Sequence, residues 1–176
     1  MILAGRNRGL TLVELIVSIG LFAVVMVVST GAYLSVSGAN RQAQAITKAN
    51  TSLAFALESM VRTIRTGTNY WCGSGSSGDC PYPGGNSLFT VTPIDGFGPV
   101  AYAYDAGLHA ITANGTVITD PFVQVNSLRF YATGTATGDS GQPHVTIVIA
   151  GTVPGVHGGT IPFTVETGAT FRGTDL

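Results

Sequence analysis

The first long stretch of the chain is apolar on every side. Residues 15–34 are rich in Val, Leu and Ile, and no charged residue occurs from Leu15 to Asn40. Twenty helical residues rise about 30 Å, which is the hydrocarbon thickness of a bilayer. A chain of 176 residues is too short to surround such a helix with protein, so the pattern predicts a membrane-spanning helix.

The pattern then changes to a single apolar face. Six positions recur in alternating steps of four and three residues, and they are Ile46, Asn50, Leu53, Leu57, Met60 and Ile64. This spacing is typical of an amphipathic helix. No proline occurs before Pro81, and Gly67 is a natural helix end. We therefore predict one helix over residues 10–66, apolar all round at first and with one face to bury afterwards.

After residue 70 the helical spacing disappears. We predict a loop over residues 70–85, followed by segments with strand-like alternation at 88–92, 100–104, 108–112, 116–118, 123–132, 145–150 and 161–166. Asn114-Gly115 suits a two-residue hairpin turn. The predicted fold class is α+β, in which the long N-terminal helix packs on a C-terminal antiparallel β-sheet that forms a head.

The two cysteines, Cys72 and Cys80, flank a Gly- and Ser-rich segment. Such a pair around a flexible loop is typical of a disulfide in an oxidising compartment. A zinc site would need further ligands, and His109, His144 and His157 show no paired spacing. We predict a Cys72–Cys80 disulfide, which favours a head outside the cytoplasm.

The head is acidic. Residues 67–176 carry two arginines and seven Asp or Glu residues, a formal charge of −5. This charge repels phosphate, so we expect no nucleic acid to bind the head. The sequence contains no Gly-x-Ser-x-Gly elbow, no phosphate loop and no paired histidines, and Asp139 alone offers too few oxygens for calcium. We therefore predict no enzyme activity, no cofactor and no metal.

Glu14 is the only charged residue between Arg8 and Arg41. An acidic side chain at a bilayer centre costs about 2.5–3.5 kcal/mol on the insertion scale, and less near a helix end. Its carboxylate could reach back to the lipid headgroups, or a positive group on a neighbouring chain could neutralise it. Composition alone leaves both interpretations open.

The residues around Glu14 resemble a known signal. Gly9-Leu10-Thr11-Leu12-Val13-Glu14-Leu15, after a short basic leader, is similar to the prepilin signal of type IV pilins and pseudopilins. The resemblance implies that a prepilin peptidase cleaves between Gly9 and Leu10 and methylates the new N-terminus at Leu10, where relatives most often carry Phe. It also implies that Glu14 meets the N-terminal amine of an adjacent subunit during assembly.

A more diffuse resemblance, to J-type pseudopilins and W-type minor pilins, extends into the head. It rests on residues 57–65, Val100-Ala101-Tyr102, residues 122–130 and 143–147, and a closing Phe171-Arg172. It implies a minor rather than a major filament subunit.

These features predict four segments. They are a prepilin leader (1–9), a transmembrane and filament-core helix (10–38), an amphipathic helix that packs on the head (39–66), and a β-rich head with a Cys loop at 72–80 (67–176). The resemblance implies a structural subunit, a minor pilin or pseudopilin, of a type IV pilus or type II secretion-like filament. It would span the inner membrane once, with its head outside, before it joins other subunits at the inner-membrane assembly platform.

Two alternatives remain open. An ordinary secretory signal could be cleaved near residues 29–32, although this leaves Glu14 and the Gly9 boundary unexplained. The chain could also be a single-pass anchored β-domain that binds or hydrolyses a ligand. The head of an enzyme should show a pocket with convergent polar residues, whereas the head of a pilin should not.

Overall fold

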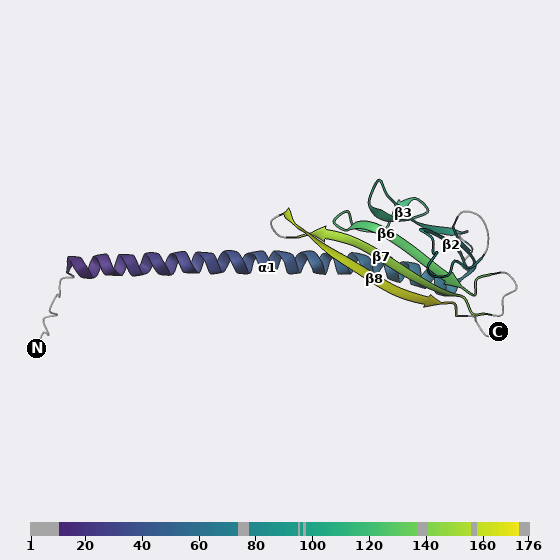
Figure 1. The fold of residues 1–176 in the computed structure, drawn as a ribbon, viewed down its shortest axis with the longest axis horizontal. Coiled ribbons are helices and arrows are strands. Elements are labelled where there is room, and N and C mark those ends of the chain that lie inside the picture. The colour runs from purple at the N-terminus through teal and green to yellow at the C-terminus, as the bar shows by residue number, and fades with distance from the viewer. Residues whose placement is uncertain are drawn as a thin grey trace, which may run out of the picture. The chain divides into compact units, whose positions relative to one another are not determined.

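The protein begins with a long helix. Its structure, a computed structural model, describes residues 11–73, 78–94, 96, 98–136, 141–155 and 158–172. Helix α1 spans Leu12–Thr66, a length of 55 residues (Figure 1). The predicted helix is confirmed over this span and ends directly before Gly67, while its predicted start at Leu10 lies outside the described residues. The chain divides into two compact units, one up to Arg41 and one from Gln42 onward.

The described part of the head folds into two antiparallel sheets rather than the single sheet that the sequence predicted. The five-stranded sheet has the order β1-β2-β3-β4-β5, and the three-stranded sheet has the order β6-β7-β8. The strands are β1 Gly67–Cys72, β2 Leu88–Pro93, β3 Val100–Asp105, β4 Ala110–Ala113, β5 Thr116–Val117, β6 Gln124–Thr133, β7 His144–Pro154 and β8 Thr160–Thr170. Within each sheet, every strand pairs with the next one along the chain. A long helix followed by antiparallel sheets confirms the predicted α+β fold class.

Strand β1 was not predicted, because its residues were assigned to the helix end and the Cys loop. It pairs with β2 and contains a β-bulge: Thr68 pairs with Thr92 and Trp71 with Thr90, so β1 uses one residue more than β2. Asn69, inside the bulge, has a φ of 52°. The left-handed conformation and the bulge break the alternation on which strand prediction depends.

The predicted turn at Asn114-Gly115 is confirmed. These two residues connect β4 to β5 and have φ values of 50° and 79°, as a two-residue primed turn requires. The Asn114 side chain also accepts a hydrogen bond of 2.7 Å from the Ala101 backbone N–H, which ties the turn to β3.

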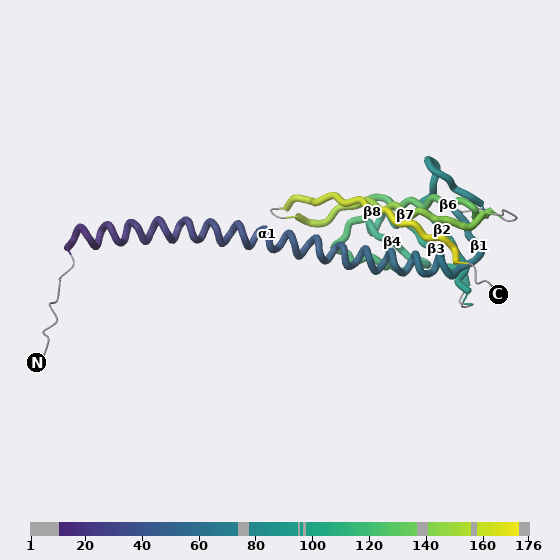
Figure 2. The backbone as a smooth tube through the Cα atoms, turned by 90° about the horizontal axis from the view of Figure 1, so that it is seen from below, coloured from purple at the N-terminus to yellow at the C-terminus, as the bar shows by residue number. Residues whose placement is uncertain are grey.

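The core of the head forms where residues 42–66 of α1 lie along both sheets (Figures 1 and 2). The buried helix residues are Ala49, Leu53, Ala56, Met60 and Ile64. They pack with buried residues of both sheets, including Phe89, Phe130 and Ile147. The predicted stripe is therefore correct at its end but wrong at its start, where Ile46 is 39% exposed and Asn50 is exposed.

Tyr70 closes the core at the end of α1. Its side chain is buried, and its hydroxyl donates toward the carbonyl oxygens of Ile64 at 2.9 Å and Gly67 at 2.6 Å. These contacts satisfy acceptors that the end of a helix otherwise leaves unpaired. Burial raises the pKa of Tyr70 to about 12, because the charged phenolate would lose its hydration in the core.

Gly67 permits the close approach of α1 to β2, and this gives a first prediction. A Cβ at this position would collide with the Val91 side chain and lie 2.8 Å from the Thr63 carbonyl oxygen. We expect Gly67→Ala to lower the free energy of unfolding of the head by about 1–3 kcal/mol, a typical cost of overpacking. Thermal unfolding of the full chain in lipid nanodiscs measures this loss. The matched control is Gly78→Ala, because a Cβ at Gly78 meets no atom within 4 Å. Equal stability of the two variants would contradict the prediction.

Candidate functional site

The start of α1 is capped by a residue of the predicted signal. The backbone N–H of Glu14 donates to the Thr11 side-chain oxygen at 3.3 Å, and the N–H of Leu15 donates to the Thr11 carbonyl at 3.1 Å. Thr11 is therefore the N-cap, and Glu14 occupies the third helical position, which is the spacing of a capping box. A carboxylate in the first turn is also favoured by the helix dipole. Sequence analysis did not consider this local role for Glu14.

The unit that ends at Arg41 exposes an apolar surface. Large hydrophobic residues from Leu12 to Val36 are between 51% and 74% exposed. The hydroxyls of Ser18 and Thr30 donate to the carbonyls of Glu14 and Met26, at 2.7 and 2.8 Å, which hides these polar groups against the backbone. An 18-residue window of α1 has a mean hydropathy of 2.6, none of it is buried, and the helix is long enough to cross a membrane.

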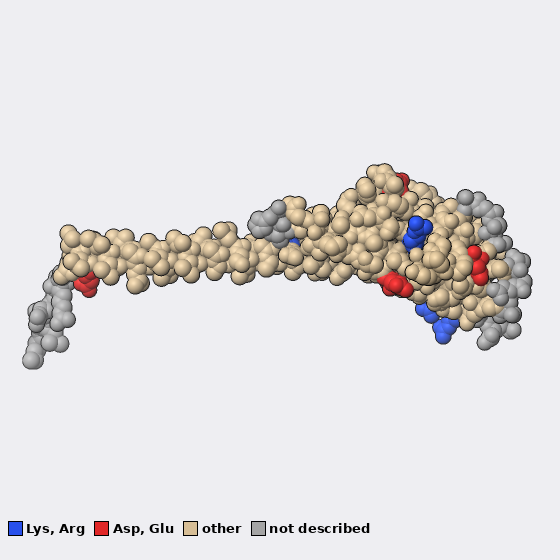
Figure 3. Space-filling view, viewed as in Figure 1, with Lys and Arg blue, Asp and Glu red and all other residues tan. Residues whose placement is uncertain are grey.

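The charge distribution on the visible face agrees with this description. Figure 3 shows acidic atoms near the beginning of α1 and then a long uncharged surface before the next charged side chains appear. The sequence has no charged residue between Glu14 and Arg41. This part of α1 is therefore suited to a lipid or protein environment rather than to water.

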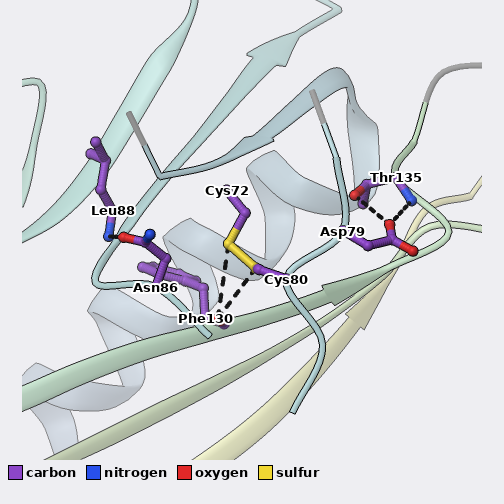
Figure 4. Close-up of a disulfide and its surroundings, with 7 residues drawn as sticks. All are labelled: Cys72, Asp79, Cys80, Asn86, Leu88, Phe130 and Thr135. Carbon is purple, nitrogen blue, oxygen red and sulfur yellow. Dashed lines mark hydrogen bonds between the residues drawn. A yellow bond between two sulfur atoms is a disulfide. The ribbon is translucent and has the colours of Figure 1, made fainter. Parts of the chain in front are cut away.

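In the head, the predicted disulfide between Cys72 and Cys80 is present (Figure 4). The two Cα atoms are 6.1 Å apart. Cys72 ends β1 in the five-stranded sheet, and Cys80 exchanges backbone hydrogen bonds of 2.9 and 3.2 Å with Ala132 in β6. The bridge therefore links the edge of one sheet to the edge of the other. The sequence spacing predicted the bond but not this role.

Asp79, next to Cys80, holds the turn that follows β6 (Figure 4). Its carboxylate accepts hydrogen bonds from the Thr135 N–H at 2.7 Å, the Thr135 hydroxyl at 2.8 Å and the Gly134 N–H at 3.1 Å. These bonds, first of all the one from the Thr135 N–H, lower the pKa of Asp79 below its usual range. The disulfide and this carboxylate together anchor residues 79 and 80 to β6.

The remaining residues considered in the sequence fall into two groups. Gly9, Leu10, Asp139 and His157 lie outside the described residues. His109 and His144 are exposed, and their rings contact the hydroxyls of Tyr104 and Thr170 respectively. Within the described residues, no group of three or more His, Cys, Asp or Glu side chains is placed to hold a metal ion.

Beside β1 lies a cavity of about 600 Å³, which sequence analysis did not foresee for a pilin-like head. Its described lining contains aromatic, threonine and asparagine side chains but no Asp, Glu, His, Lys, Arg or Cys. Residues 137–140, which lie between two of these lining residues, are outside the described part of the chain.

Comparison with known proteins supports one assignment for the start of the chain. Residues 5–30 match the prokaryotic N-terminal methylation motif. This match covers the end of the predicted leader and the first part of α1, and it supports a type IV pilin-like subunit. No curated protein and no solved structure matches the chain significantly.

The position of the disulfide gives a second prediction. Closing a loop with a sequence separation of 8 contributes about 2–3 kcal/mol to stability in the chain-entropy treatment. We expect the double variant Cys72→Ser, Cys80→Ser to unfold at a temperature lower by roughly 10 °C, and the reduced wild-type protein to behave in the same way. The control is the double variant itself, whose midpoint should not respond to reductant. A wild-type midpoint that reductant leaves unchanged would rule out a stabilising bridge.

Asp79 gives a third prediction, on pH. Because its pKa is lower in the folded protein than in the unfolded chain, its stabilisation is present above the ordinary value of 3.8 and is lost as the pH falls through the lowered folded value. We expect Asp79→Asn to lower the unfolding temperature at pH 7, and the difference from wild type to shrink below about pH 4. Glu166→Gln serves as the control, since this exposed carboxylate has no hydrogen bond to another described residue. A difference that persists unchanged at low pH would contradict the charge-dependent role.

Proposed function

We propose that the protein is a structural subunit, a minor pilin or pseudopilin, of a type IV pilus or type II secretion-like filament. The observation that carries the proposal is the methylation motif at residues 5–30, which coincides with the start of an exposed apolar helix. In this function a prepilin peptidase removes residues 1–9 and methylates Leu10. The mature subunit then consists of a membrane or filament-core segment (10–38), an amphipathic helix segment (39–66) and the head (67–176).

The exposed apolar surface supports storage in the inner membrane before assembly. Covering a large aliphatic or aromatic side chain is worth about 1.5–3 kcal/mol relative to leaving it in water. The bilayer covers this surface in the isolated subunit, and neighbouring subunits cover it in a filament. The disulfide supports an orientation in which the head lies on the oxidising, outer side of the membrane.

Glu14 links the stored subunit to the assembled one. A carboxylate and an ammonium group about 4 Å apart attract by about 4 kcal/mol at an effective dielectric constant of 20. The free amine of Leu10 in an adjacent subunit supplies such an ammonium group after cleavage. This attraction offsets much of the cost of holding the carboxylate in an apolar surrounding, so assembly neutralises a charge that the isolated subunit must tolerate. A subunit that keeps this residue is suited to docking beneath others rather than to standing at the tip.

The fourth prediction separates the charge of Glu14 from its place in the helix cap. Glu14→Leu removes the carboxylate, whereas Thr11→Val removes the cap oxygen and keeps the carboxylate. We expect both variants to enter the membrane and to begin at Leu10 by N-terminal sequencing. Only Glu14→Leu should co-purify poorly with partner pilins, by about tenfold or more, because a lost attraction of 1.4 kcal/mol already corresponds to tenfold.

Three results would count against this account. Wild-type protein that retains residues 1–9, or that begins near Ala32, would remove the pilin-like assignment itself. Normal recovery of Glu14→Leu with partner subunits would remove the charge-pairing role. Equal losses for Glu14→Leu and Thr11→Val would assign the effect to helix capping instead.

A further inference from the structure

Strand β8, Thr160–Thr170, is an edge of the three-stranded sheet. It pairs with β7 on one side and with no described strand on the other. Its register with β7 is continuous along its whole length of 11 residues. A free strand edge carries a row of unpaired backbone N–H and C=O groups, and such a row is a template for pairing with another chain.

The ladder with β7 shows which backbone groups of β8 are free. The N–H of Phe171 donates to the Pro143 carbonyl at 2.9 Å, whereas the N–H of Arg172 donates to the Arg65 carbonyl at 3.2 Å, on the side away from β7. Successive residues of an antiparallel strand alternate in this way. The residues of β8 whose backbone faces away from β7 are Thr160, Pro162, Thr164, Glu166, Gly168 and Thr170. Their outward backbone groups make no hydrogen bond to another described residue.

The other edges of the described sheets are short, interrupted or partly covered. Strand β5 has 2 residues, and β1 has 6 residues and contains the bulge. The edge of β6 is bridged by Cys80 and Asn86. Short strands, bulges and covering loops are the devices by which natural sheets avoid unwanted pairing. On β8 only Pro162, which has no N–H, and the charge of Glu166 serve this purpose.

The inward-facing side chains of β8 are incompletely covered. Ile161, Phe163 and Val165 pack against the core but remain half-buried, while Ile147 and Ile149 of β7 are 0% exposed. The difference arises because β7 has a strand on each side and β8 has one on a single side. An added strand would therefore gain apolar contacts as well as backbone hydrogen bonds.

The middle of this edge is beyond the reach of the C-terminus. Residues 173–176 lie outside the described part of the chain, and four residues extend at most about 14 Å. Thr164 precedes Arg172 by eight residues, which is about 26 Å along a strand. The backbone groups of Thr164 and Glu166 are thus available to another molecule.

The direction of β8 decides against a second copy of this chain as the partner. Strand β8 runs beside residues 42–66 of α1 in the same direction, and the Arg172–Arg65 hydrogen bond joins their ends (Figures 1 and 2). An exact two-fold axis pairs two β8 edges antiparallel. Residue 42 of the two chains would then lie at opposite ends of the pair, whereas chains anchored in one membrane enter from the same side. This step rests on the membrane anchoring of the proposed function.

The charge of the head indicates the chemistry of the partner. Residues 67–176 have a formal charge of −5, and Glu166 is the one charged side chain of β8. A strand with Lys or Arg opposite Glu166 would form a favourable cross-strand pair, and the field of the head would attract it. A second β8 would instead bring another Glu166 close to the first.

We propose that β8 accepts a basic, extended segment of a different polypeptide as an antiparallel fourth strand. The backbone of this segment bonds to Thr164 and Glu166, and its apolar side chains lie beside Phe163 and Val165. A Lys or Arg of the segment lies opposite Glu166. In strand addition the main chain supplies affinity and alternate side chains supply specificity. The surface would give the head a partner in addition to its contacts through α1.

The probe is a fluorescent peptide, Lys-Val-Thr-Val-Lys-Ile-Thr-Val-Lys, with N-methyl groups on its apolar residues. These methyl groups face solvent in the docked peptide and prevent it from pairing with itself. An isomeric control carries the same number of methyl groups on Lys and Thr residues, whose N–H groups face β8. Fluorescence anisotropy is measured with the full chain in nanodiscs of zwitterionic lipid. We expect the probe to bind saturably and the isomer to bind at least about tenfold more weakly.

Variants of β8 then locate the contact. Thr164→Pro removes an outward N–H at a position equivalent to Pro162, so the edge should accept it. Thr164→Val keeps this N–H and is the matched control. We expect Thr164→Pro to weaken binding of the probe by about tenfold or more and Thr164→Val to bind as wild type. Glu166→Lys should reverse the preference, so that a probe with glutamates in place of lysines binds more tightly than the basic one.

Thermal unfolding shows which variants are folded, and if Thr164→Pro is not, the isomeric peptide and Glu166→Lys decide. The proposal is overturned if the basic probe does not bind saturably, if the isomer binds equally well, or if folded Thr164→Pro keeps the wild-type affinity. An unchanged charge preference in Glu166→Lys also overturns it. Sedimentation of the full chain in micelles tests the second copy, since a dimer that Thr164→Pro dissociates would replace the partner strand. None of these results bears on cleavage after Gly9 or on assembly through Glu14.

Discussion

The head depends on burying one face of a helix against two sheets. Met60 is fully buried and Ile64 is 1% exposed, while Ala49 and Ala56 are small enough to let the helix backbone lie close to the strands. Phe89, Phe130 and Ile147 would otherwise face water, and covering each of them is worth about 1.5–3 kcal/mol. The helix after residue 42 is therefore part of the core of the head, and the sheets have no other described helix to cover them.

The same helix has a second requirement that the head does not meet. Before Arg41 it exposes Val, Leu, Ile and Phe side chains and carries a single charge, at Glu14. One continuous element, Leu12–Thr66, thus has two kinds of surface. The first needs a lipid or a neighbouring helix, and the second is satisfied by its own chain. What covers the first surface can therefore change without refolding the head, because the core uses only residues that follow Gln42.

The sequence predicted the features that depend on neighbouring residues better than those that depend on residues distant in sequence. The end of α1 at Gly67, the Asn114-Gly115 turn and the disulfide were predictable, because each depends on neighbouring residues. The buried face was misplaced at Ile46, since Ala49 and Ala56 take the core positions and small residues carry little hydrophobic signal. The division into two sheets was missed because no local pattern records that β5 and β6 do not pair. The contact of Cys80 with Ala132 likewise joins residues whose proximity only the tertiary fold creates.

The failure at β1 has a different cause. Residues 67–72 were not predicted as a strand. Asn69 adopts a left-handed conformation there and the bulge adds a residue, so the strand does not follow the regular alternation that prediction relies on. Such a departure from local preference is retained only where the surroundings fix it, here by Tyr70 beneath and by the Cys72 bridge beside it. Strand β1 therefore forms through contacts that the tertiary fold supplies, its pairing with β2 first among them, rather than through a pattern that its own residues show.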